Sequence, residues 1–137
     1  MGSVGQVSLE YLLLLACIFS IFAALLPLLA GVFDLCLFGL DVISARDFSS
    51  SLEQAVWEVS FQGQGSVYVV KARPVGEWLV HSSGKTLFIE VIGPGHSKVF
   101  PVDFPNDVGF FRKSFSSERV FFVSRVSGKV LLEYDDP

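Results

Sequence analysis

Cysteine and histidine are scarce in this chain of 137 residues, which has two of each. Cys17 and Cys36 lie in or beside one apolar stretch, about 28 Å apart if that stretch is helical. A disulfide needs Cα atoms within about 7 Å, so the two cannot pair within one helix. His81 and His96 have no Cys or spaced acid nearby that would indicate a triad or a metal site. We therefore expect no enzyme, no cofactor and no metal site.

Positively charged residues are absent from the N-terminal third of the chain. No Lys or Arg precedes Arg46, and Glu10 is the single charged side chain before Asp34. The ten basic residues are scattered, and the formal net charge is −4. Because phosphate binding needs clustered Lys and Arg, a nucleic-acid partner is not expected.

The apolar run from Tyr11 to Phe33 contains no charge. As a helix it would be roughly 34 Å long, enough to cross a hydrocarbon core of about 30 Å. It is longer than the apolar core of a secretory signal peptide and has no small-residue cleavage site at its end. We therefore expect residues 6–33 to form a transmembrane helix.

The helical pattern continues beyond Phe33, with apolar residues spaced by three and four. These residues are Phe38, Val42, Ala45, Phe48, Leu52, Ala55 and Val56. The polar residues expected on the opposite side are Asp41, Arg46, Asp47, Ser51 and Glu53. Residues 34–56 are thus predicted to form an amphipathic continuation that ends near Val56. Pro27 removes a backbone hydrogen bond, and with Gly31 it predicts a kink or a locally melted turn.

After Val56 the pattern changes to period two, with β-branched and aromatic residues between turn signals. The predicted strands are Trp57–Gln62, Ser66–Arg73, Glu77–His81, Thr86–Ile92, Lys98–Val102, Val108–Lys113, Arg119–Val126 and Lys129–Tyr134. Ser127-Gly128 between two strands indicates a hairpin. The expected fold class is α+β, with a long N-terminal helix and an antiparallel sheet or small β-sandwich over residues 57–137.

Several predicted strands are apolar on both faces, as in Val67-Tyr68-Val69-Val70 and Val120-Phe121-Phe122-Val123. A sheet with one face in water would alternate more cleanly, so these strands should be covered twice. One cover is the helix. The other is a second sheet, a neighbouring subunit, or both.

The residues Gly5-Gln6-Val7-Ser8-Leu9-Glu10-Tyr11-Leu12 carry a resemblance. They resemble the archaeal class III signal peptide, Gln-x-Ser-x-Glu-aromatic-Leu, of type IV pilin-like proteins. The resemblance covers roughly residues 5–35. It implies that a prepilin peptidase cuts between Gly5 and Gln6, so that residues 1–5 are a leader and the apolar helix stays on the mature chain.

The resemblance further implies a structural subunit of a surface filament. The processing site would be Gly5 and Gln6, and the recognition and assembly residues Gln6, Ser8, Glu10 and Tyr11. The implied partners are the peptidase, an assembly ATPase with its membrane platform protein, other pilin subunits, and lipid before assembly. Before assembly the chain would be a single-pass membrane protein with its C-terminal domain outside. The α-amine of Gln6 freed on one subunit would neutralise Glu10 of a neighbour, which matters because an unpaired carboxylate in an apolar bundle costs about 2.5–3.5 kcal/mol.

Plainer readings stay open for these residues. Glu10 can mark the membrane boundary, Ser8 can be a small interfacial hydroxyl at the start of the helix, and Pro27 can be an ordinary membrane-helix proline. The first five residues also lack the Lys or Arg usual in leaders of the family. The alternative function is an uncut, membrane-tethered β domain outside the cytoplasm that binds a ligand or an envelope partner.

Overall fold

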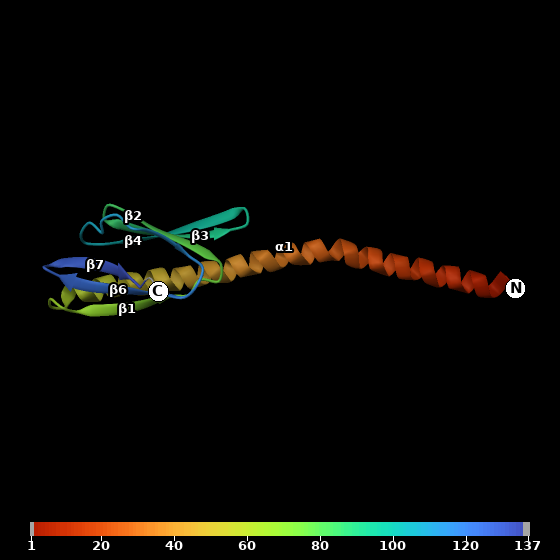
Figure 1. Cartoon of the computed structure of the whole chain (residues 1–137), viewed down its shortest axis with the longest axis horizontal. Helices are drawn as coiled ribbons and strands as arrows, with labels where there is room; N and C mark the ends of the chain where they lie inside the picture. The colour runs from red at the N-terminus through yellow and green to blue at the C-terminus, as the bar shows by residue number, and fades with distance from the viewer. Residues whose placement is uncertain (1, 136–137) are drawn as a thin grey trace. The chain divides into compact units, whose positions relative to one another are not determined.

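The computed structural model describes residues 2–135 and contains one helix followed by seven strands (Figure 1). The elements are α1 (Gly2–Phe61), β1 (Val67–Ala72), β2 (Glu77–Ser83), β3 (Thr86–Gly93), β4 (His96–Asp103), β5 (Arg112–Phe115), β6 (Arg119–Val126) and β7 (Lys129–Tyr134). All strand pairs are antiparallel. The α+β class expected from the sequence is confirmed.

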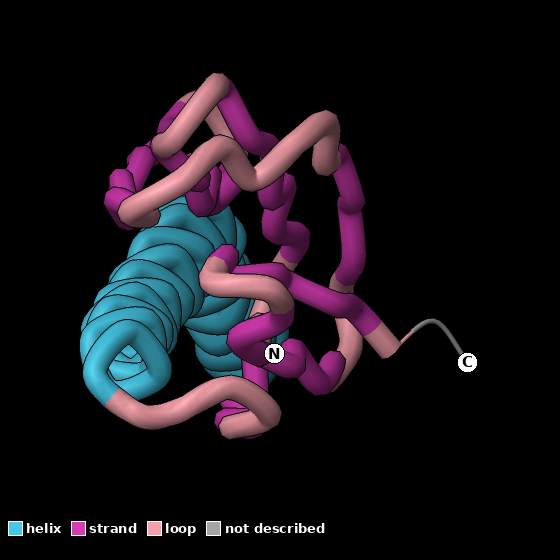
Figure 2. The backbone as a smooth tube through the Cα atoms, turned by 90° about the vertical axis from the view of Figure 1, so that its left-hand side faces the viewer, coloured by secondary structure: helices cyan, strands magenta, loops and turns pink. Residues whose placement is uncertain are grey.

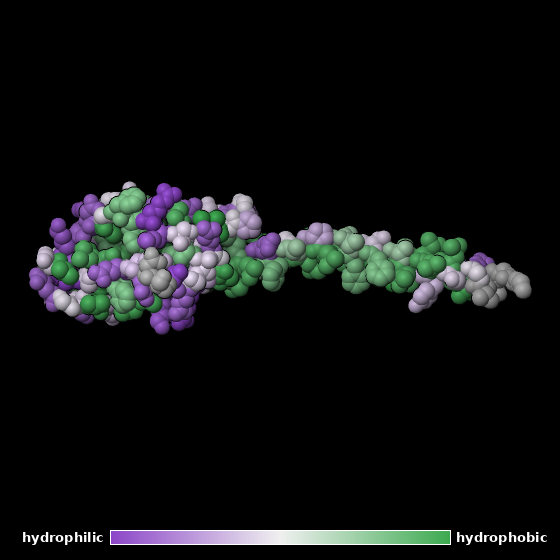
Figure 3. Space-filling view, viewed as in Figure 1, coloured by the Kyte–Doolittle hydropathy of each residue, from purple (hydrophilic) through white to green (hydrophobic). Residues whose placement is uncertain are grey.

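The chain divides into two units, Met1–Cys36 and Leu37–Pro137. The N-terminal unit consists of the first part of α1, whose surface is dominated by apolar residues (Figure 3). The C-terminal unit contains the rest of α1 and all seven strands.

The strands form two sheets with the orders β1-β6-β7 and β4-β3-β2-β5. Two-residue turns join β2 to β3, β3 to β4 and β6 to β7. In the β6–β7 hairpin, Ser127 and Gly128 have φ angles of 53° and 78°, the positive values that a two-residue type I′ turn requires. The hairpin predicted from Ser127-Gly128 is therefore present.

The core of the C-terminal unit lies between the inner faces of both sheets and one stripe of α1 (Figure 2). The helix contributes Ala45, Phe48, Leu52, Ala55, Val56 and Val59, which are buried and spaced by three and four. Phe48 packs between the two sheets, with its ring 5.8 Å from Trp78 of β2 and 5.2 Å from Phe121 of β6. The apolar stripe predicted for the helix is thus the surface on which both sheets rest.

The helix is longer than predicted. It ends at Phe61 instead of near Val56, and the strand predicted over Trp57–Gln62 is wrong. The residues there alternate between apolar and polar, which favours a strand, but Val59 also continues the helical stripe and is buried in the core. Helical propagation plus burial of Val59 outweighs the local β propensity.

The strand predicted over Val108–Lys113 is also displaced, since β5 covers Arg112–Phe115. A tight turn precedes it: Asp107 Oδ1 accepts a hydrogen bond from the Gly109 N–H, and Gly109 has a φ of 77°. This backbone conformation cannot be part of a strand. The other six strands agree with the sequence prediction to within two residues at each end.

We expect Phe121→Ala to lower the free energy of unfolding of the C-terminal unit by about 3–5 kcal/mol, because it empties the centre of the core. Phe121 is fully buried and contacts four further rings, those of Phe48, Phe111, Phe115 and Tyr134. Urea unfolding of the full chain in detergent, followed by tryptophan fluorescence, measures the loss. The matched control is Phe110→Ala, since Phe110 is 93% exposed. A change above about 1 kcal/mol in the control, or below that in Phe121→Ala, would contradict this assignment of the core.

Candidate processing and assembly site

The residues of the pilin-like motif lie on the first turns of α1. Gln6 and Glu10 are one turn apart and therefore share one face of the helix. Gly5, Ser8 and Tyr11 are exposed, as are Gln6 and Glu10. The helix thus presents the residue that would carry the new amine and the carboxylate on the same side.

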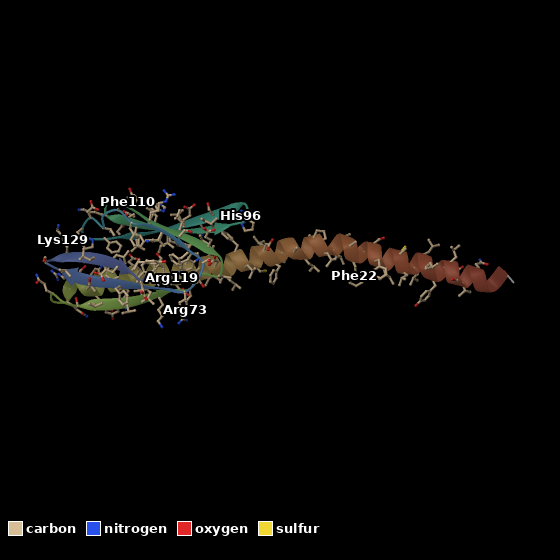
Figure 4. The ribbon with its side chains drawn as sticks, viewed as in Figure 1. Phe22, Arg73, His96, Phe110, Arg119 and Lys129 are labelled. Atoms are coloured by element: carbon tan, nitrogen blue, oxygen red, sulfur yellow. The ribbon has the colours of Figure 1, made fainter. Side chains whose placement is uncertain are left out.

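From Tyr11 to Phe33, α1 has large apolar side chains on every side. Its large apolar side chains from Val7 to Phe33 are all exposed, and Phe22 in Figure 4 projects outward from the helix. Among the described residues, α1 is the one helix long and apolar enough to cross a membrane. Such a surface is compatible with a membrane anchor.

Glu10 is the exception within this surface. Within residues 2–135, no hydrogen bond or ion pair reaches its carboxylate. Ser20, in contrast, donates its hydroxyl hydrogen to the Ala16 carbonyl of the same helix at 2.8 Å and needs no external partner. Glu10 is therefore the one charged side chain between Val7 and Phe33, and Asp34 follows directly after this stretch.

The Gly5–Gln6 peptide bond lies inside α1, which begins at Gly2. A protease that cuts there would have to open the first turn of the helix. The helix also continues through Pro27 and Gly31, so the melted turn predicted there is absent. A kink at Pro27 stays a prediction.

In the C-terminal unit, the sequence prediction for one carboxylate of α1 is wrong. Asp41, expected on the polar side, is only 3% exposed. Its Oδ1 accepts hydrogen bonds from the Val75 N–H (2.9 Å) and the Trp78 indole N–H (2.5 Å), and its Oδ2 from the Gly76 N–H (3.0 Å). A Cβ at Gly76 would lie 2.9 Å from Oδ2, so the close approach requires glycine.

A signal for Asp41 was present in the sequence. It lies three residues after Phe38 and four before Ala45, which places it on the apolar stripe rather than opposite it. An acid on such a stripe indicates a buried partner. Its role here is to hold the β1–β2 loop and β2 against the helix.

The last turn of α1 is held by polar contacts from the three-stranded sheet. Arg125 of β6 donates hydrogen bonds to the carbonyls of Ser60 (2.8 Å) and Gln62 (2.9 Å), which the helix itself leaves without donors. Glu58 accepts a hydrogen bond from the Tyr68 hydroxyl, and this bond, reinforced by the negative charge of Glu58, raises the pKa of Tyr68. Both contacts fix β1 and β6 to the helix end.

The remaining titratable groups are dispersed. His81 stacks on Phe88 at 5.3 Å, and His96 lies 5.8 Å from Phe38. In the part of the chain that the structure describes, no three His, Cys, Asp or Glu residues are grouped so that they could hold a metal ion.

A shallow groove of about 360 Å³ lies at the end of α1. Its lining is Val56, Trp57, Ser60, Phe61, Asp103, Phe104 and Pro105. Trp57 and Phe61 stack at 4.5 Å and are exposed, because the extra helical turn directs them away from the core. The groove has few polar groups to orient a ligand.

Comparisons of this chain with protein-family models, with curated proteins and with solved structures give no match.

We expect Asp41→Ala to destabilise the C-terminal unit by on the order of 3 kcal/mol, because three N–H donors would lose their acceptor. Urea unfolding of the full chain in detergent measures this. A shift of the Trp78 indole N–H resonance in NMR spectra would place the effect at this site. The matched control is Asp47→Ala on the same helix, since Asp47 is exposed and should change the stability by less than about 0.5 kcal/mol. Equal losses in both variants would contradict a special role for Asp41.

Proposed function

We propose that this chain is a structural subunit of a type IV pilin-like surface filament of the archaeal kind. A prepilin peptidase removes residues 1–5, and the mature chains assemble by packing their α1 helices together. The observation that carries the proposal is the carboxylate of Glu10, without a partner in residues 5–135, at the start of a stretch of α1 that carries no other charge as far as Phe33.

The apolar surface of α1 suits two environments in turn, first the membrane and then the filament. The stretch from Tyr11 to Phe33 is long enough to span a bilayer, so lipid covers it before assembly. A bundle of the same helices covers it equally well afterwards, since the apolar side chains of neighbouring copies replace lipid tails. One surface therefore serves as membrane anchor and as filament core.

The placement of Glu10 supports bundling of processed chains. Scission before Gln6 creates an α-ammonium one turn from Glu10 on the same helix face. When copies pack side by side, the ammonium of one chain can pair with the carboxylate of the next. Pairing offsets the cost of an isolated carboxylate in apolar surroundings, about 2.5–3.5 kcal/mol.

The C-terminal unit supplies the exposed part of the subunit, outside the membrane before assembly and on the surface of the filament afterwards. An assembly ATPase and its membrane platform protein are the partners that such assembly requires, with the peptidase acting first. Copies of this chain or related subunits complete the polymer.

A second candidate is a membrane-tethered β domain that is never cut. The observation in its favour is the absence of Lys and Arg from the first five residues, since basic leaders usually keep this end in the cytoplasm. In that case the groove beside Trp57 and Phe61 is the first place to look for a ligand.

Mass spectrometry of the full chain, expressed in membranes with and without an archaeal prepilin peptidase, tests the processing step. We expect a chain that begins at Gln6 when the peptidase is present and an uncut chain when it is absent. Chains that keep residues 1–5 in the presence of an active peptidase, verified on a known substrate, would favour the tether.

Replacement of Glu10 tests the assembly step. Because an unpaired ammonium is left in the bundle, we expect Glu10→Ala to insert normally, and its cut chains to enter filaments at least about tenfold less than cut chains with Glu10, the factor that 1.4 kcal/mol represents. Immunoblots of sheared filaments against membrane fractions give the ratio. Asp34→Ala, which removes the other acid of the N-terminal unit, is the matched control and should stay within twofold. Unchanged incorporation of Glu10→Ala would overturn the pairing.

A further inference from the structure

The outer face of the sheet β1-β6-β7 is apolar and uncovered within the described chain. Residues that alternate with the buried ones on β1, β6 and β7 point away from the core. They include Val67, Val69, Val120, Phe122, Val126 and Leu131. Val67 and Val69 are 58% and 52% exposed. This is the second apolar face that the sequence indicated, and neither the helix nor the other sheet covers it.

At the end of this face that contains Val120, acidic and basic side chains lie at opposite edges. The β1 edge carries Lys71, while Arg73, directly after the strand, is paired with Glu118 at 3.4 Å. The β7 edge carries Glu133, with Asp135 directly after the strand, and Lys129 lies at the far end of β7. Lys71 and Asp135 both flank Val120, the first through the strand register and the second through its N–H bond to the Val120 carbonyl. At the end of the sheet near Val120, the β1 edge is therefore basic and the β7 edge is acidic.

We propose that this outer face binds the same face of a second copy of the chain, about a two-fold axis that runs along β6. Rotation about such an axis leaves each residue at the same position along the strand direction. It places the β1 edge of one copy over the β7 edge of the other. Lys71 of each copy then lies opposite Asp135 of the other, and the apolar residues of the two faces meet in the centre. The face is complementary to itself in both charge and polarity.

The outer face of the other sheet does not have this pattern. Its outward residues mix apolar side chains with Glu77, Glu90 and Asp103, and the row of Arg112 on its β5 edge holds His81, Phe88 and Pro101 but no acid. A contact between the edges of β1 and β7 would satisfy the charges but leave Val69 and Phe122 in water. Face-to-face packing both pairs the charges and removes the apolar residues from water.

The contact is small. Three strands spaced about 4.8 Å apart, over about six residues of 3.4 Å, give a face on the order of 300 Å² per copy. Stable interfaces bury about 800 Å² per partner, so this one is weak in dilute solution. It becomes significant when copies are concentrated in one membrane or filament, where the effective concentration is high.

The contact goes beyond the proposed filament role and does not depend on helix bundling. A two-fold contact closes on itself, so it does not extend a polymer. It joins chains in pairs, either within one membrane or between neighbouring filaments. Glu10→Ala should weaken bundling and leave this contact intact, so that failure of the two proposals can be told apart.

Thiol cross-linking of the full chain in lipid vesicles tests the contact. The starting variant carries Cys17→Ser and Cys36→Ser, which remove the two native thiols. Ser124 lies between Val67 and Leu131 on the proposed axis. We expect Ser124→Cys to give covalent dimers with a short bis-maleimide, in the Glu10→Ala background as well. The matched control, Val99→Cys on the outer face of the other sheet, should give at least fivefold fewer dimers.

Charge reversal tests the predicted pairing. Lys71→Glu places two acids opposite each other and should lower cross-linking of Ser124→Cys several-fold, as should Asp135→Lys. The double variant, with both changes, should restore it. Lys85→Glu, an exposed change in the β2–β3 turn, should have no effect.

Three outcomes would overturn the proposal. The first is equal cross-linking from Ser124→Cys and Val99→Cys, which would indicate random collision. The second is a Ser124→Cys thiol that reacts fully with a monofunctional maleimide but yields no dimers, since the face would then be open or bound to something else. The third is loss of the dimers with Glu10→Ala or failure of the double charge reversal to restore them.

Discussion

The folded unit depends on a carboxylate buried at the start of its helical segment. Asp41 is held by three N–H donors from the β1–β2 loop and β2, and the approach is so close that a glycine must occupy position 76. A charged hydrogen bond in a buried site defines direction and register in a way that apolar contacts do not. With Trp78 fixed to the helix, Phe48 has a defined place between the two sheets, and the remaining core follows from that arrangement.

The same helix obeys two different rules along its length. From Ala45 to Val59 it has one apolar stripe, which the two sheets cover. From Tyr11 to Phe33 its large apolar side chains are exposed on every side. The outer face of β1-β6-β7 is a smaller exposed surface with apolar residues. The two proposals assign both surfaces to contacts between copies of the chain.

Much of this architecture could be predicted from the sequence, because it follows from periodicity and turn chemistry. The bounds of β6 and β7 were predicted as found, with the hairpin at Ser127-Gly128 between them. The errors occur where local and tertiary preferences disagree: Trp57–Gln62 alternates like a strand but stays helical because Val59 reaches the core. Asp41 was misplaced because a charge was assumed to face water, whereas its partners lie more than thirty residues ahead in the sequence. The position of Gln6 and Glu10 on one helix face follows from their spacing of four residues.

Arg125 donates hydrogen bonds to the carbonyls of Ser60 and Gln62. Together with the contacts of Asp41, these bonds determine how the C-terminal unit responds to force. The segment of α1 between these two attachments is about 30 Å long and runs through the core. A force along the helix axis would be transmitted to the sheets at both ends of this segment, through the hydrogen bonds of Asp41 and Arg125. Between these ends it would act as shear on the packed core side chains. No slack peptide tether lies between helix and core, so tension would be spread over the whole segment rather than unravelling it from one end.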